Sequence, residues 1–158
     1  MSTHTAIVEW HSNGSRFTDN RYSRAHQWRF DGGAVVPASS SPHVVRVPLS
    51  DPAGVDPEEA YVAALSSCHM LWFLSIAADA GLAVDSYRDE ASGVMAKNEA
   101  GNEWIARVVL RPHVVVRGET PVDRAALDAL HHRAHEACFL ANSVKTDVVV
   151  EGTVSVGG

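Results

Sequence analysis

The sequence predicts an α+β protein in which two long helices pack on one face of a mostly antiparallel sheet. Three observations lead to this fold class: strand-like segments come first, a long apolar helical segment fills the middle of the chain, and a β-rich half with a second helix follows. Because 158 residues suffice for one domain with a sizeable core, we assign residues 1–158 to a single domain.

The first third of the chain predicts short strands joined by loops. Residues 3–11 and 21–30 alternate in polarity, as half-buried strands do, and the turn-forming segment "SNGSRFTDN" separates them. The tight turn "DGG" at 31–33 leads into another short strand. The stretch after it is rich in Pro and Ser and predicts an extended loop, with a short strand at 43–47.

The strongest local signal is a helix over residues 57–80. Asp56 is a suitable N-cap, Pro57 occupies the first helical position, and Glu59 completes an Asp-x-x-Glu capping pattern. Gly81 is a natural stop. After the first turn, apolar residues fall on nearly every side, so we expect other elements to surround this helix.

The rest of the chain predicts a hairpin, a second helix and a final strand. The β-branched segments 82–96 and 103–117 flank the turn "NEAGNE" and indicate a long hairpin. Thr120 is the expected N-cap of the second helix, with Pro121 at its first position and Ala137 near its end. The closing stretch "VKTDVVVEGTVSV" predicts one strand.

The composition argues against two classes of partner. The formal charge is −6, the pI is about 5.8, and no Lys/Arg cluster is present, so no nucleic-acid footprint is visible. The N-terminus carries no basic segment followed by an apolar one. The uncharged run Ala60–Ala78 approaches membrane-spanning length, but Ser66, Ser67 and His69 interrupt it. We therefore expect a cytoplasmic protein that does not enter a membrane.

Two cysteines, Cys68 and Cys138, are the residues with the clearest chemical potential. They are either two inert buried thiols or a catalytic redox pair, and the pair requires the two helices to cross. Adjacent helical side chains point about 100° apart, so His69 is a poor base for Cys68 and better suited to packing or hydrogen bonding. The hydroxyls of Ser66 and Ser67 can bond to their own helix backbone.

A metal site is the competing interpretation. His131, His135 and Cys138 lie roughly on one helical face, and Cys68 with His69 could complete a zinc site. No Cys-x-x-Cys or His-Glu-x-x-His pattern accompanies them. A non-catalytic protein that binds a small molecule or a metal therefore remains the alternative hypothesis.

The segment "VDPEEAYVAALSSCH" resembles the OsmC/Ohr family of thiol peroxidases. Glu58 precedes Cys68 by ten positions, as in the Pro-Glu…Cys pattern of that family, and "CFLANSV" around Cys138 is similar to the segment with the family's second cysteine. The stretches "YSRAHQWRFDGG" and "VPASSSP" also resemble a branch of the family. The resemblance covers nearly the whole chain and implies an OsmC-like fold in an intertwined homodimer.

The resemblance also implies an activity. Cys68 would be the nucleophile that reduces an organic hydroperoxide, and Cys138 would be the resolving thiol that forms a disulfide with it. A dithiol reductant, of lipoyl or thioredoxin-like type, would reopen the disulfide, and no cofactor or metal is implied. The apolar lining that would suit an alkyl or lipid hydroperoxide is expected from Trp72, Phe73, Leu74 and Phe139, unless these side chains are simply core.

Glu58 matches the family glutamate that pairs with an active-site arginine. For that arginine we favour Arg24, with Arg46 second and Arg29 third. Ten residues along a straight helix place Glu58 about 15 Å from Cys68 and on another side. The sequence thus requires either a kink in this helix or a site in which Glu58 serves the partner subunit.

Overall fold

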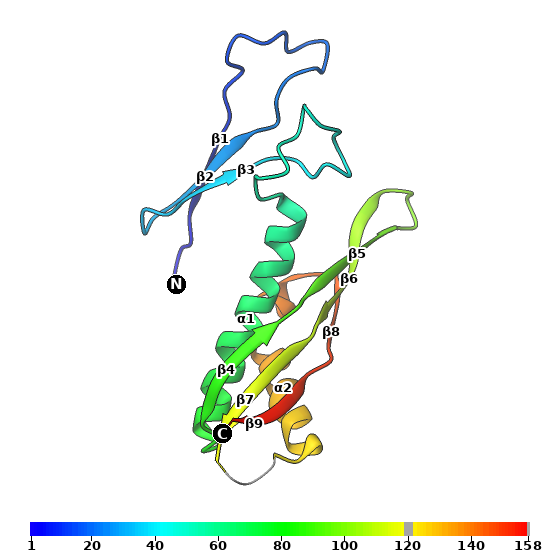
Figure 1. Cartoon of the computed structure of the whole chain (residues 1–158). Helices are drawn as coiled ribbons and strands as arrows, with labels where there is room; N and C mark the ends of the chain where they lie inside the picture. The colour runs from blue at the N-terminus through cyan, green and yellow to red at the C-terminus, as the bar shows by residue number, and fades with distance from the viewer. Residues whose placement is uncertain (119–121, 158) are drawn as a thin grey trace. The chain divides into compact units, whose positions relative to one another are not determined.

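The computed structural model of the chain describes residues 1–118 and 122–157. Its contacts divide the chain into two compact units, which are described separately: unit 1 is Met1–Ala60 and unit 2 is Tyr61–Gly158. Figure 1 shows the helices and strands of each unit.

Unit 1 contains a three-stranded antiparallel sheet in the order β1-β2-β3. Its strands are β1 (Ala6–Glu9), β2 (His26–Phe30) and β3 (Val35–Ala38). Val8 pairs with Trp28, and Trp28 pairs with Val36, so β2 is the central strand. The three predicted strands of this region are confirmed, although each is shorter than its alternating segment.

The strand predicted at 43–47 is wrong. This stretch forms turns, because the backbone N–H groups of Val44 and Val45 both donate to the carbonyl of Ser41. Amides that close a turn in this way are not available to a sheet. β-Branched composition alone did not reveal that competition.

Helix α1 (Pro57–Asp79) begins and ends as its sequence predicts. The backbone N–H of Asp56 donates to the Glu59 carboxylate at 2.9 Å, and the N–H of Glu59 donates to the Asp56 carboxylate at 2.8 Å. This reciprocal pair is a capping box. Gly81 follows the helix with φ of 76°, a left-handed conformation that favours glycine.

Unit 2 contains two three-stranded sheets. One has the order β4-β7-β9, from β4 (Val84–Asp89), β7 (Pro112–Arg117) and β9 (Thr153–Gly157). The other has the order β5-β6-β8, from β5 (Ser92–Lys97), β6 (Glu103–Leu110) and β8 (Asp147–Val150). Pairs β4–β7 and β5–β6 are antiparallel, whereas β6–β8 and β7–β9 are parallel. The α+β prediction is confirmed, with mixed sheets.

The predicted hairpin exists, but each arm is divided between the two sheets. The outgoing arm breaks after Asp89 and the returning arm breaks at Arg111, while the final strand breaks at Glu151. The Asp89 carboxylate accepts the backbone N–H of Arg111 at 2.6 Å, and the N–H of Glu151 donates to Leu110. These two hydrogen bonds join neighbouring segments of the chain at the points where the strands are interrupted.

Helix α2 (Arg124–Ala137) begins later than predicted. Its N-cap is Asp123, with extended backbone angles and no side-chain capping bond, and the short 3₁₀ helix η1 (Ala141–Ser143) follows. Val122 and Asp123 are not helical. The start predicted at Pro121 and the capping role predicted for Thr120 lie outside the described residues.

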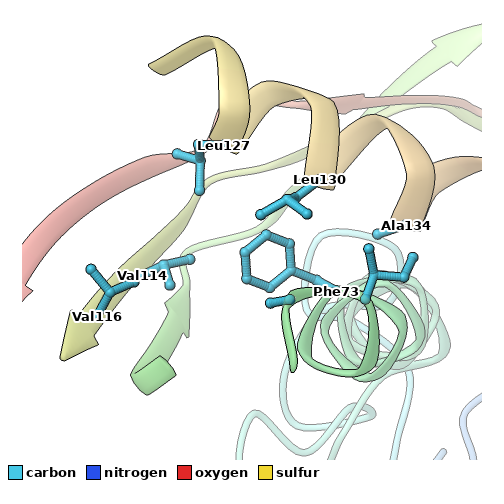
Figure 2. Packing of buried hydrophobic residues seen from close by; sticks show 8 residues of the cluster. Phe73, Val114, Val116, Leu127, Leu130 and Ala134 are labelled. Carbon is cyan, nitrogen blue, oxygen red and sulfur yellow. The ribbon is translucent and has the colours of Figure 1, made fainter. Parts of the chain in front are cut away.

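The main core of unit 2 lies between the two helices and strand β7. Phe73 and Ala77 of α1 are fully buried in this core. Figure 2 shows Phe73 between Leu127 and Ala134 of α2 and Val114 of β7. In Figure 1 both helices lie behind the strands of unit 2. The helices therefore cover one face of the sheets, as the sequence predicts.

The described residues of unit 2 cover one side of α1. Leu65 packs on β6, and Phe73 packs on α2, whereas the opposite face has no partner among those residues. There Ala63, Ser67 and Leu71 are exposed, with 62% of the Leu71 surface accessible. Apolar side chains lie all around the helix, and the described residues of unit 2 pack against one side of it.

By length and composition α1 could also cross a membrane. One such helix is weak evidence for a membrane protein, because the core helix of a water-soluble domain has the same length and apolar character. Here its buried face contributes to both hydrophobic clusters of unit 2.

Candidate functional site

Helices α1 and α2 bring the two cysteines together. Cys68 lies in the middle of α1 and is half-buried, whereas Cys138 caps the C-terminus of α2 and is only 1% exposed. Both are free thiols, and they lie close enough for one to affect the other. Burial raises the pKa of the Cys138 thiol above its ordinary value, and the neighbouring side chain of Cys68 raises it further.

A tight turn encloses the sulfur of Cys138. The backbone N–H of Ala141 donates to this sulfur at 3.5 Å. The backbone N–H groups of Ala141 and Leu140 lower the pKa of Cys138, in opposition to burial. The Asn142 side chain donates to the carbonyls of Glu136 and Cys138, at 2.8 Å and 3.0 Å. Asn142 thus fastens the turn to the end of α2.

Only part of the expected apolar lining is available to a ligand. Phe73 is fully buried and belongs to the core, and Leu74 packs against the same cluster, so the structure contradicts a lining role for Phe73. Trp72 meets the ring of Phe139 edge-on, with centroids 5.4 Å apart. Phe139 follows Cys138 directly and is 70% exposed. Trp72 and Phe139 are therefore the aromatic surface that remains near the thiols.

His69 is a packing residue of the buried core. Its Nε2 lies 3.0 Å from Nδ1 of His131, and the two rings stack with centroids 5.3 Å apart. Phe73 stacks on the other imidazole at 4.2 Å. Burial, followed by repulsion from the neighbouring imidazoles, lowers the pKa of His69 to about 4, and burial lowers that of His131 to about 4. Both rings are neutral at pH 7.

Ser66 has a partner across the fold rather than in its own helix. Its hydroxyl donates to the Asp89 carboxylate, which also accepts the backbone N–H of Arg111. The expected bond back to the helix backbone is therefore wrong for Ser66, whereas Ser67 is exposed. Ser66 joins α1 to the break between the two sheets.

The charged residues predicted for the site belong to unit 1. Arg24 precedes β2, and its guanidinium donates to Asn20 and to the carbonyl of Tyr22 while lying 3.8 Å above the Tyr22 ring. Arg29 pairs with Glu9 at 3.2 Å. The exposed guanidinium of Arg46 has no hydrogen-bond or salt-bridge partner among residues 1–118 and 122–157.

Glu58 lies in the first turn of α1, and the helix continues without a break through Cys68. The rise of an α-helix separates residues ten positions apart by about 15 Å. The two solutions that the sequence allowed, a kink in this helix or a role for Glu58 in the partner's site, both stay predictions.

A metal centre is not supported. Within the described part of the chain, no group of three or more His, Cys, Asp or Glu side chains is arranged to hold a metal ion. The face of α2 that carries His131 and His135 instead borders a pocket of about 340 Å³ against β8. Arg124 and Asp128, which pair at 2.8 Å, also line that pocket.

Comparison with known families decides the membership of this chain. The sequence model of the OsmC-like protein family matches residues 50–152, which include both cysteines. The chain belongs to the OsmC-like protein family. A search of curated proteins finds no match.

Solved structures agree with this membership. An OsmC-like protein of unknown function from Vibrio cholerae is 57% identical to this OsmC-like chain, with a TM-score of 0.93 over 96% of this chain and 99% of that one. An organic hydroperoxide resistance protein from Elizabethkingia anophelis has 17% identity and a TM-score of 0.67, covering 99% and 98%. The organic hydroperoxide resistance protein OhrB of Bacillus subtilis has 16% identity and a TM-score of 0.61, covering 98% of each chain. At these lower identities the likeness shows the shared fold.

Sequence reasoning did not find two features of the site. The buried hydrogen bond between His69 and His131 joins residues 62 positions apart, and no local sequence pattern predicts it. The clamp formed by Asn142 could have been suspected, because Asn favours side-chain bonds to nearby backbone groups just after a helix.

Proposed function

We propose that this OsmC-like protein is a cytoplasmic thiol peroxidase that reduces organic hydroperoxides. The observation that carries the proposal is the pairing of its two thiols, one half-buried and one buried, at the contact of α1 and α2. A reactive thiol must be reachable by substrate, whereas its resolving partner needs only to be reachable by the first sulfur. This difference supports Cys68 as the nucleophile and Cys138 as the resolving thiol.

The reaction follows from these roles. The Cys68 thiolate attacks the outer oxygen of the hydroperoxide, the O–O bond breaks, and the alkoxide takes up a proton and leaves as an alcohol. Cys68 is then a sulfenic acid. The Cys138 thiol attacks its sulfur, which forms the disulfide and releases water. A dithiol reductant, lipoyl or thioredoxin-like, returns two electrons to the pair by exchange.

The aromatic surface beside the thiols supports an organic substrate. The exposed ring of Phe139 and the half-buried ring of Trp72 offer apolar contact to an alkyl or lipid chain. Hydrogen peroxide would gain nothing from such a surface. We therefore expect the protein to consume an alkyl hydroperoxide faster than hydrogen peroxide.

A homodimer is part of the proposal. The face of α1 with Ala63, Ser67 and Leu71 has no partner among the described residues of unit 2, and a second copy would bury it. Glu58 would then serve the partner's site, because the continuous helix separates it from Cys68 of its own chain.

An arginine completes the proposed chemistry, since a permanently charged guanidinium favours a thiolate and negative charge on the departing oxygen. On the family resemblance we keep Arg24 as the first candidate and Arg46 as the second. Single Ala variants of Arg24 and Arg46 distinguish the two candidates. The active-site arginine should be the one whose replacement slows the oxidation of Cys68.

The decisive experiment compares Cys68→Ser with the control Ser86→Ala, which changes an exposed serine of β4. Consumption of cumene hydroperoxide with dithiothreitol should vanish in the first variant and persist in the second, while circular dichroism shows both folded. Without dithiothreitol, which would reduce a sulfenic acid directly, Cys138→Ser should consume one equivalent of peroxide and then stall with Cys68 as a sulfenic acid. Peroxide turnover by Cys68→Ser would refute the assignment.

A non-catalytic role in binding a small molecule is the second candidate. The pocket of about 340 Å³ between α2 and β8 favours it, because Val148 and Val150 offer an apolar wall opposite the side chains of α2. Thiol titration after a brief pulse of cumene hydroperoxide separates the two functions. A binding protein should keep both thiols countable, whereas a peroxidase should lose both.

A further inference from the structure

We infer that the disulfide between the two cysteines is opened from one side only: the reductant attacks the sulfur of Cys68, and Cys138 leaves as a thiolate held in the turn that Asn142 fastens. This inference rests on the proposed function and extends it to the entry point of the reductant. Its basis is the unequal surroundings of the two sulfurs.

Access is the first difference between the sulfurs. Cys138 is 1% exposed, and the backbone N–H of Ala141 reaches its sulfur at 3.5 Å, so the turn that ends α2 occupies its surroundings. Cys68 is half-buried on α1, and Ala64, one helical turn before it, is exposed. An attacking thiolate must approach a sulfur from outside, and only Cys68 offers such an approach.

The leaving group is the second difference, and here two effects oppose each other. Burial raises the pKa of Cys138, which slows its departure as a thiolate, whereas the N–H groups of Leu140 and Ala141 stabilise that thiolate. Access decides between the sulfurs, because a poorer leaving group only slows exchange, while an unreachable sulfur is not attacked at all. The backbone N–H groups of Leu140 and Ala141 partly offset this slower exchange, because they stabilise the Cys138 thiolate.

Asn142 is a positioning residue in this scheme. Its side-chain amide bonds two carbonyls at the end of α2, and its own backbone N–H donates to the carbonyl of Cys138 at 3.1 Å. These bonds hold the segment that carries the Leu140 and Ala141 amides against the sulfur. Without the clamp the turn should open and uncover Cys138.

The exchange then proceeds in two balanced steps. A thiolate of the reductant bonds to the Cys68 sulfur, the S–S bond breaks, and its electron pair stays on Cys138. The second thiol of the reductant then attacks the reductant's own sulfur, which closes a cyclic disulfide and releases Cys68 as a thiolate. A monothiol cannot take this second step, and the neighbouring Cys138 thiolate reverses the first. The site should therefore turn over with a dithiol and stall with a monothiol.

The test traps the mixed disulfide. Diamide, a general thiol oxidant, forms the disulfide without relying on peroxidase activity; excess 2-mercaptoethanol then opens it, and iodoacetamide stops the exchange within seconds. Peptide mass mapping should find the mercaptoethanol adduct on Cys68 and the alkyl group on Cys138, at least tenfold over the reverse pattern. Equal labelling, or an adduct mainly on Cys138, overturns the inference.

The matched variants are Asn142→Ala and Asn98→Ala. Asn98 also bonds backbone groups of a turn in unit 2, accepting from Ala100 and Asn102 in the β5–β6 hairpin. The adduct should spread to both cysteines in Asn142→Ala and stay on Cys68 in Asn98→Ala, a pattern that general loosening of the fold would not produce. An unchanged pattern in Asn142→Ala refutes the positioning role.

The outcomes for the inference and for the proposed function are separable. A disulfide that forms with diamide but not with cumene hydroperoxide removes the peroxidase proposal and leaves the direction of opening intact. Failure of diamide to link Cys68 with Cys138 overturns the inference and removes the disulfide step from the proposed reaction.

Discussion

Acidification should destabilise this protein through its buried imidazole pair. His69 and His131 are 2% and 4% exposed, and the pKa of each is lowered from 6.5 to about 4 in the folded chain. Between those values the unfolded chain binds more protons than the folded one. The free energy of unfolding is therefore highest above pH 6.5, and it decreases as the pH falls toward 4, because the two histidines favour the unfolded chain there.

The size of the effect follows from the two pKa values. At pH 5 an unfolded histidine is largely protonated while a buried one stays neutral, which lowers the free energy of unfolding by about 2 kcal/mol per histidine relative to pH 8. The pair therefore accounts for about 4 kcal/mol, out of a total that is typically about 5–15 kcal/mol. With a urea m-value of about 2 kcal/mol/M, the midpoint should fall by about 2 M.

The assay is urea unfolding followed by tryptophan fluorescence between pH 8 and pH 5, at one fixed protein concentration. His131→Gln should lose about half of the pH dependence, because it leaves one titrating imidazole in the core. His132→Gln is the matched control, since this neighbour on α2 is 72% exposed and pairs with Glu136 at the surface. A midpoint that does not move between pH 8 and pH 5, or equal slopes for both variants, would refute the reasoning.

Two further predictions concern packing, and both are measured by urea unfolding at pH 8. Gly152→Ala should lower the free energy of unfolding by about 2 kcal/mol or more, because the added Cβ would lie 2.5 Å from Nε2 of His131, whereas Gly32→Ala meets nothing within 4 Å and should be nearly neutral. Equal stability of these two variants would contradict the packing around the imidazole. Ser66→Ala should cost about 1–2 kcal/mol, because it leaves the carboxylate at the sheet break without its hydroxyl donor, while the exposed Ser67→Ala should stay within about 0.5 kcal/mol of wild type. A larger loss from Ser67→Ala than from Ser66→Ala would reverse that assignment.

The local signals of the sequence predicted local structure well. Asp56 and Glu59 form the capping box that their spacing indicates, and Gly81 adopts the left-handed conformation that ends α1. These features depend on residues within a few positions of each other, so the local sequence is sufficient to predict them. The strand at 43–47 failed because Ser41 offers a closer partner for the same amides.

The sequence by itself determined the capped helix α1, the β5–β6 hairpin and, through the spacing of Glu58 and Cys68, the family to which the chain belongs. Only the tertiary structure decided that the second thiol meets the first, that β8 and β9 run parallel to their neighbours, and that His69 is bound to a second buried imidazole. The physical reason is the distance along the chain between the residues that interact. Caps and turns are settled by neighbours along the chain, whereas contacts between distant residues depend on how whole faces of helices and sheets pack.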